Sequence, residues 1–327
     1  MEYTSDVEAV DAMAQSYKDL KKEIGKVIVG QDDVVKAVII ALFSNGHSLL
    51  VGVPGLAKTL LVSTIAEVLD LDFKRIQFTP DLMPSDITGS EILDEDRHFK
   101  FNRGPLFSNI VLADEINRTP PKTQAALLEA MQERSVTVSG TRHELPKPFF
   151  VLATQNPVEL EGTFPLPEAQ VDRFLMRIGL GYPGREDERQ ILRRFRTSNP
   201  LVELGAVIST DDVQRANRAC REVYVHPVLE DYLLDLVAAT RKDSAFALGV
   251  SPRGSLALYR TAQAAAAISG RAYVIPDDIK RMALPVLAHR LAPSIEARLH
   301  SQSPGDRLAA LLAQTPVPVE EVWTARA

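Results

Sequence analysis

The chain contains the loop Gly52-Val53-Pro54-Gly55-Leu56-Ala57-Lys58-Thr59, which follows an apolar run and opens a segment with helical periodicity, Lys58–Leu69. A loop of this kind between a buried strand and a helix is typical of a Walker A motif. Its backbone N–H groups can bind phosphates, the Lys58 ammonium can reach their β and γ oxygens, and the Thr59 hydroxyl can ligate Mg²⁺. The strict pattern has glycine directly before the lysine, so we expect Ala57 to fold without a positive φ. The residues predicted to bind nucleotide here are Gly52, Val53, Pro54, Gly55, Leu56, Ala57, Lys58, Thr59 and Leu60.

Five short apolar runs predict the strands of one parallel sheet. They show little alternation and are followed by turn or polar residues, as expected of strands that are buried on both faces. Periodic segments such as Lys58–Leu69 and Thr123–Arg134 supply crossover helices for an α/β layer. The runs are Ser48–Val53, Phe73–Phe78, Asn109–Ala113, Phe149–Thr154 and Leu175–Leu180.

The pattern changes after Gly181-Tyr182-Pro183-Gly184, where convincing strands become scarce. We therefore expect an α/β core with an N-terminal helical segment over residues 1–184. A smaller all-α unit with a C-terminal tail is expected over residues 185–327. The helical segments predicted in this second unit are Glu186–Arg196, Thr210–Val223, Leu229–Lys242, Ser255–Ala267 and Pro276–Leu291.

Composition narrows the class of protein. The 327 residues are 45% apolar and 24% charged, which is ordinary for a globular chain and excludes disorder. The net charge of −6, without a basic cluster, argues against nucleic acid as a partner. Cys220 is the only cysteine, so a disulfide within the chain is excluded and a buried thiol is expected. With neither a signal segment nor a long apolar run, we expect a cytoplasmic protein without membrane insertion.

A pair of acids ends the third apolar run, in Ala113-Asp114-Glu115. Read as a Walker B motif, Asp114 holds Mg²⁺ through its water shell. Glu115, on the other face of the sheet end, polarises the attacking water. An acidic pair after a strand is also an ordinary turn, but its combination with Lys58 favours the catalytic interpretation.

Three further polar residues are candidates. Asn156 follows the fourth run, where open α/β sheets bind ligands, although Asn-Pro is also a common turn pair. Arg173 directly precedes the fifth strand, and an arginine there is often solvated or paired with an acid. Arg253 lies in the first turn of a helix capped by Ser251, where the helix dipole disfavours a cation by roughly 0.3–1 kcal/mol. A bound phosphate or a local acid could compensate.

The segment Leu82–Arg103 interrupts the α/β pattern and reads as an insertion. A long excursion beside a nucleotide core can be a functional loop, or a surface hairpin without a role of its own. The histidines show no metal-ligand spacing and are interpreted as structural.

Together these motifs resemble the MoxR family of AAA+ ATPases, and the match spans nearly the whole chain. The resemblance implies that Ala57 is usual in the loop and that Asn156 is the sensor-1 residue. It further implies that Arg173 is an arginine finger acting on a neighbouring subunit and Arg253 the sensor-2 arginine of a helical lid. Ile28 and Val29 then belong to the segment that packs on adenine. The matching stretches are Gly52–Thr59, Leu112–Glu115, Ala153–Pro157, Pro167–Phe174 and Ser251-Pro252-Arg253.

The resemblance also sets expectations for assembly and activity. It implies a P-loop core with a five-stranded sheet, an all-α lid, ATP or ADP with Mg²⁺ as cofactors, and a hexameric ring. Thr59 and Asp114 are the expected metal ligands, and Leu82–Arg103 matches an insert that faces the pore of the ring. A chaperone-like role follows, with von Willebrand factor A domain partners and the maturation or metal loading of client proteins.

Two other functions stay open at this point. A motor that translocates DNA or RNA is possible because related rings use similar inserts, but the net charge argues against it. A nucleotide-gated scaffold that scarcely hydrolyses ATP is the other alternative, and Glu115 argues against that. The residues predicted to carry catalysis are Glu115, Asn156, Arg173 and Arg253.

Overall fold

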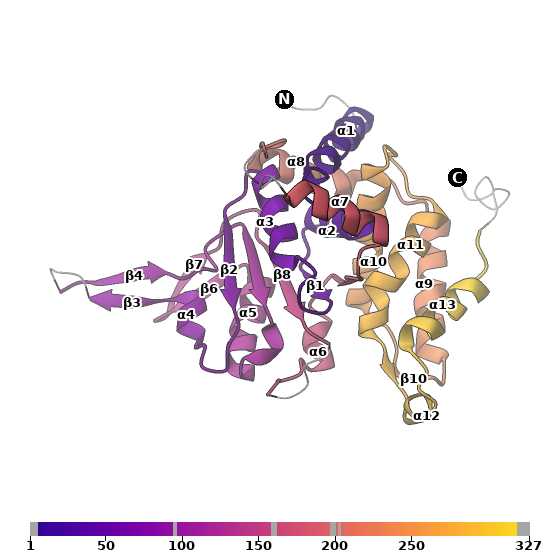
Figure 1. Ribbon diagram of the computed structural model, residues 1–327. Helices are drawn as coiled ribbons and strands as arrows, with labels where there is room; N and C mark the ends of the chain where they lie inside the picture. Colours follow the sequence, from indigo (N-terminus) through magenta and orange to yellow (C-terminus); the bar gives the residue numbers. More distant parts are fainter. Residues whose placement is uncertain (1–5, 94–96, 158–161, 197–200, 202–203, 319–327) are drawn as a thin grey trace.

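The computed structural model describes residues 6–93, 97–157, 162–196, 201 and 204–318. Its centre is a parallel five-stranded sheet with the strand order β2-β5-β8-β1-β9 (Figure 1). This confirms the sheet that the five apolar runs predict, with strand ends shifted by up to two residues. The strands are β1 Ser48–Val51, β2 Phe73–Gln77, β5 Ile110–Asp114, β8 Phe150–Gln155 and β9 Met176–Gly179.

Helices cover both faces of the sheet. Neighbouring residues of a strand point to opposite sides, so each strand contributes to two apolar layers. Leu50 packs in the layer that contains α2 (Asp32–Phe43) and α3 (Lys58–Val68). Its neighbour Leu49 packs on the other side, in the layer of α5 (Pro121–Glu133). Burial on both faces explains why the strands read as continuous apolar runs.

The insertion folds as a short helix followed by a hairpin that projects from the body of the molecule (Figure 1). A second hairpin, which the sequence patterns did not predict, lies at its base, and the ring of Phe101 stacks on that of His143 with centroids 4.0 Å apart. The elements are α4 Pro84–Thr88, β3 Gly89–Leu93, β4 Phe99–Arg103, β6 Ser135–Val138 and β7 Thr141–Glu144.

The second half of the chain is mostly helical, as predicted. The segment expected at Pro276–Leu291 is shorter, because the α-helix ends at Leu287 and a 3-10 turn, Ala288–Arg290, follows. The helices are α6 Glu168–Val171, α7 Arg185–Phe195, α8 Thr210–Glu222, α9 Pro227–Lys242, α10 Pro252–Ile268, α11 Pro276–Leu287, α12 Ile295–Leu299 and α13 Pro304–Gln314. Two short strands, β10 Phe246–Leu248 and β11 Ala292–Pro293, pair with each other.

The N-terminal helix α1, Asp6–Ile24, packs against α8 and α10 (Figure 1). Cys220 of α8 is buried there, with its Sγ 3.7 Å from Sδ of Met13 in α1, and burial raises the pKa of the thiol. The thiol is therefore buried, as expected. Within the described ranges, no helix is both long and apolar enough to cross a membrane.

Candidate nucleotide site

The phosphate loop adopts a conformation that the sequence pattern did not predict. Gly55 has a φ of +86° and Ala57 a φ of +54° with a ψ of 31°. The expectation that Ala57 folds without a positive φ is therefore wrong. Ala57 lies directly before α3, and its carbonyl accepts the first helical hydrogen bond, from the N–H of Leu61 at 2.9 Å. Left-handed residues in such a loop turn backbone N–H groups toward one concave side, which suits an anion.

Lys58 begins α3, and its ammonium lies over the loop. Its Nζ donates hydrogen bonds to the carbonyls of Gly52 at 2.7 Å and Val53 at 3.4 Å. Burial lowers the pKa of Lys58, and the carboxylates of Asp114 and Glu115 act in the opposite direction. The structure therefore brings the predicted phosphate ligand and the predicted acidic pair into one electrostatic neighbourhood.

Asp114 ends β5 with both carboxylate oxygens occupied by neighbouring side chains. The Thr154 hydroxyl of β8 donates to Oδ1 at 2.6 Å. Nη2 and Nε of Arg75, on β2, donate to Oδ2 at 2.7 and 3.2 Å. The pairing of β2 and β8 with β5 places these residues beside Asp114.

Glu115 follows with a φ of +57°, which ends the alternation of the strand. Its N–H donates to the Thr154 hydroxyl at 2.8 Å. Its Oε2 accepts a hydrogen bond from Gln77 at 2.9 Å and pairs with Nε of Arg118 at 2.9 Å. Because Arg75 and Gln77 are two residues apart on β2, they share a face. The two carboxylates thus contact one face of β2, rather than opposite faces of the sheet end as expected.

Sequence reasoning missed these partners of the acidic pair. The only local signal is the pattern of β2, Phe73-Lys74-Arg75-Ile76-Gln77, in which two polar residues occupy alternate positions. Without the order of the strands, that pattern gives no reason to place Arg75 and Gln77 beside Asp114 and Glu115.

Asn156 is buried directly after β8. Gln155, its neighbour, pairs with Val51 of β1, and its carbonyl accepts a hydrogen bond from the N–H of Gly52 at 3.4 Å. The adjacency of β1 and β8 therefore brings Asn156 to the same edge of the sheet as the loop.

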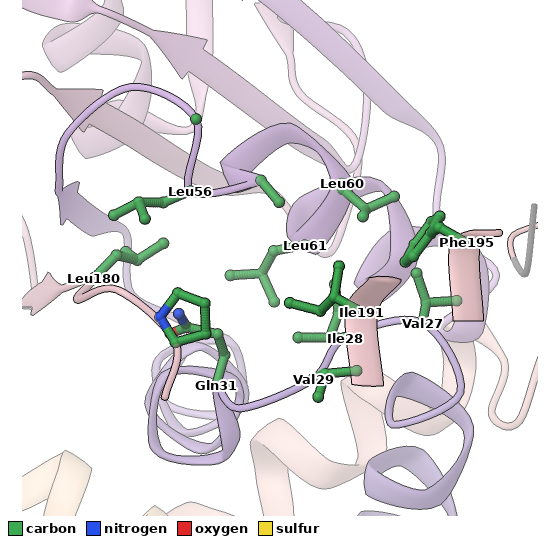
Figure 2. A pocket seen from close by; sticks show the side chains of 13 residues that line it. Val27, Ile28, Val29, Gln31, Leu56, Leu60, Leu61, Leu180, Ile191 and Phe195 are labelled. Carbon is green, nitrogen blue, oxygen red and sulfur yellow. The ribbon is translucent and has the colours of Figure 1, made fainter. Parts of the chain in front are cut away.

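An apolar pocket lies beside the loop (Figure 2). Ile28 and Val29 enter it from the segment between α1 and α2, and Leu60 enters from α3. Ile191 and Phe195 of α7 form another wall, and sequence reasoning missed both. Their spacing of four residues places them on one helix face. Such a pocket suits the flat apolar surface of a nucleobase.

The two predicted arginines lie outside this cluster. Nη1 of Arg173 donates to the carbonyl of Leu128 in α5 at 3.1 Å. Nη1 of Arg253 lies 3.8 Å from Oδ2 of Asp172, so a local acid accompanies this cation at the start of α10. Among the described residues, no hydrogen bond or ion pair connects either arginine to residues 52–59.

Two family models match separate parts of the chain. Residues 47–176 match the ATPase family associated with various cellular activities (AAA), and residues 238–310 match the AAA lid domain. The chain is 46% identical over 300 residues to the uncharacterized protein YeaC of Bacillus subtilis, covering 91% of this chain and 94% of that protein. It is 46% identical over 292 residues to the chaperone MoxR1 of Mycobacterium tuberculosis, covering 86% and 77% respectively.

The chain belongs to the MoxR family of AAA+ ATPases. The fold of this MoxR-family protein also superposes on the crystal structure of a candidate ATPase from Cytophaga hutchinsonii. That comparison has a TM-score of 0.90 and 43% identity, and it covers 95% of this chain and 98% of the other.

The residues present fit a nucleotide with its metal ion. An added Cβ at Gly55 would meet no atom within 4 Å, so the space beside this loop residue is open. Lys58 supplies a cation there, and the apolar pocket of Figure 2 adjoins the loop residues Gly55 and Ala57. For Mg²⁺ the available oxygen donors are the Thr59 hydroxyl and the Asp114 carboxylate, which is the donor type that this ion prefers.

Proposed function

We propose that this protein is a Mg²⁺-dependent ATPase that acts as a homo-oligomeric ring, and that hydrolysis drives the remodelling or maturation of protein clients. The observation that carries the proposal is the convergence of Lys58, Asp114 and Glu115 at one end of the sheet, beside an apolar pocket. A cation, two carboxylates and a base pocket are the parts that nucleotide hydrolysis requires.

Each residue of this cluster has a distinct role in the proposal. Lys58 would hold the terminal phosphates, while Thr59 and Asp114 would hold Mg²⁺. The bound ion would neutralise charge that develops on the phosphates. Glu115 would accept the proton of the attacking water, and Asn156 would orient that water.

Arg173 would complete the site from a neighbouring subunit. Its guanidinium contacts Leu128 and not the loop of its own chain, which supports a role in trans. Ring closure by head-to-tail contacts would then supply one arginine to every site. We adopt the hexamer that the family resemblance implies, with Arg253 as the lid residue that responds to nucleotide.

For the client and partner proteins we propose only the class to which each belongs. The similarity to a protein named a chaperone supports a chaperone-like role. From the family resemblance we further propose a von Willebrand factor A domain partner, metal loading as one form of maturation, and a cytoplasmic location without nucleic acid. We also propose a functional division near residue 184 into a core and a lid.

Phosphate release by the purified protein tests the central claim. The parent should hydrolyse ATP only with Mg²⁺, and salt-sensitive stimulation by single-stranded DNA would instead favour a nucleic-acid motor. Glu115→Gln keeps the size of the side chain but removes the base, so turnover should fall by about 10²–10⁴ while ATP still binds. Hydrolysis by this variant at the parental rate would remove Glu115 from the mechanism.

Mixed assemblies test the role of Arg173. Arg173→Ala should bind ATP and hydrolyse it about 10³–10⁵ times more slowly, which is the usual contribution of an arginine finger. Mixing it with Glu115→Gln pairs an intact pocket with an intact arginine, so phosphate release should return. Co-assembly without recovery would contradict action in trans.

A further inference from the structure

Asp172 directly precedes Arg173 and contacts three side chains of the helical lid. Its Oδ1 lies 3.0 Å from Nε of Arg290, and its Oδ2 lies 3.8 Å from Nη1 of Arg253. The Ser251 hydroxyl, at the start of α10, donates to Oδ2 at 3.4 Å. One carboxylate beside the predicted finger thus pairs with two lid arginines.

Arg290 is the most constrained of these partners, with only 2% of its side chain exposed. Its Nη1 donates to the carbonyl of Val286 at 2.7 Å, within the lid. Its Nη2 donates to the carbonyl of Phe174 at 2.8 Å and to that of Asp172 at 3.4 Å. The guanidinium of Arg290 therefore forms hydrogen bonds with the backbone on both sides of Arg173.

Because Arg290 is buried, losing its contacts with this segment would cost free energy. Desolvation lowers the pKa of Arg290 to about 10, so the side chain is still charged at neutral pH. A buried cation that loses its counter-ion is strongly destabilising, because nothing replaces the lost hydration. Asp172 is the carboxylate that pairs with it, and the lid and the segment 172–174 are consequently held together at this point.

We infer that Asp172 is a positioning residue through which the lid sets the place of Arg173. Arg290 holds the Asp172 carboxylate in place. Arg253 also pairs with this carboxylate as long as the Arg253 side chain is not bound to a phosphate. The nucleotide bound in the pocket of one subunit thereby affects the position of Arg173 in that subunit. This is the arginine that acts on the pocket of the neighbouring subunit. This inference rests on the proposed action of Arg173 in trans.

Asp172→Asn removes the charge at nearly constant size and provides the test. A misplacement of about 1 Å in a catalytic group can cost on the order of 10²-fold in rate. We therefore expect a fall in hydrolysis of about 10–10²-fold, with ATP affinity within twofold of the parent. Mixing with Glu115→Gln should restore phosphate release to the level reached by the mixture of Arg173→Ala with Glu115→Gln.

A second lid ion pair offers a matched control. The Asp243 side chain is 6% exposed and pairs with Arg307 at 2.6 Å. In the part of the chain that the structure describes, its hydrogen-bond and ion-pair partners are Arg307 and Ala245, and none lies in the segment 172–174. Asp243→Asn should lower the melting temperature yet leave hydrolysis per folded subunit unchanged.

Asp172→Glu is a second test variant, which keeps the charge and the pairing with the lid while it shifts the carboxylate. It should therefore fold, and it should show a smaller loss of hydrolysis that mixing with Glu115→Gln also repairs.

Three results would overturn the inference. Parental hydrolysis by folded Asp172→Asn and Asp172→Glu would show that the carboxylate does not position the finger. A loss that mixing fails to repair, while the Arg173→Ala mixture recovers, would place the defect in the subunit's own pocket. If neither mixture recovers, the action of Arg173 in trans fails, and the inference falls with it.

Discussion

Arg75 and Asp114 form an ion pair across two neighbouring strands, with Nη2 of Arg75 2.7 Å from Oδ2 of Asp114. A guanidinium therefore lies on the carboxylate that we propose as a ligand of Mg²⁺. The Thr154 hydroxyl donates a hydrogen bond to the other carboxylate oxygen, Oδ1. Within the ion pair, the Arg75 side chain is partly exposed to solvent. A Mg²⁺ ion, whether bound directly or through its water shell, would share the negative charge of this carboxylate with the arginine.

Removal of this arginine should make Mg²⁺ bind more readily. Arg75→Gln leaves Asp114 with an uncompensated charge, and charge-assisted hydrogen bonds contribute about 1.5–3 kcal/mol, though less where solvent reaches them. We expect ATP binding to reach half-saturation at a Mg²⁺ concentration roughly three to ten times lower. Calorimetry across a Mg²⁺ titration measures this, with Lys74→Gln on the same strand as a control. A higher Mg²⁺ requirement would mean that Arg75 holds Asp114 in its binding position.

Lys58→Ala should weaken ATP binding by about 10–10²-fold, because it removes the ammonium group that we propose to bind the phosphates. The exposed Lys122 of α5 serves as the matched control, and Lys122→Ala should bind ATP like the parent. Isothermal calorimetry with ATP decides the matter. Equal affinity of Lys58→Ala and the parent would refute the assignment of the loop.

Phe195→Ala should lower the affinity for ATP and for ADP equally, by about tenfold, because the ring lines the apolar pocket that we propose for the base, and burial of such a side chain contributes roughly 1.5–3 kcal/mol. Leu192 lies on the same helix, is 74% exposed and is absent from the pocket lining. Leu192→Ala should therefore leave both affinities unchanged. An effect of Phe195→Ala on ATP alone would place this residue near the phosphates instead.

Ala57→Gly should stabilise the protein slightly. An alanine with positive φ carries a strain of about 1–2 kcal/mol, and glycine removes it at an entropic cost of about 0.4–1 kcal/mol. The free energy of unfolding should thus rise by up to about 1.6 kcal/mol. Ala66→Gly, within α3, should lower it by about 1 kcal/mol or more. Denaturant unfolding of both variants checks the opposite signs, and a loss in both would show that the loop strain is absent.

Acid should destabilise the fold through His47. Its Nδ1 accepts the N–H of Val151 at 3.0 Å and its Nε2 donates to the carbonyl of Met131 at 2.9 Å, so the ring is neutral. Burial lowers the pKa of His47 to about 3. In the unfolded chain the pKa is about 6.5, so only the unfolded state gains a proton as the pH falls below that value.

The expected loss is about 1 kcal/mol for each such histidine between pH 6 and pH 5. Burial also lowers the pKa of His289 to about 3, so this histidine contributes a second loss of stability. His47→Gln can keep both hydrogen bonds without titrating, so the pH dependence of its unfolding free energy should be about half that of the parent. An unaltered dependence would mean that His47 becomes protonated in the folded state.

Much of the fold, and the residues of the candidate site, could be predicted from sequence because the signals are local. A buried strand leaves a continuous apolar run, and the loop that we propose to bind phosphate has its glycines and Lys58 within eight consecutive residues. Asp114 and Glu115 are likewise readable at the end of their own strand. For such features, neighbours along the chain are also neighbours in space.

Only the tertiary structure could decide what lies beside these motifs. The strand order places β2 next to β5, and this brings Arg75 and Gln77 to the two carboxylates across about 40 residues of chain. The contact between Asp172 and Arg290 joins residues 118 positions apart. Even the positive φ of Ala57, a single local angle, is imposed by the junction of loop and helix. Periodicity reports which face of an element is buried, but not which element covers it, so contacts between distant segments are visible only once the chain has folded.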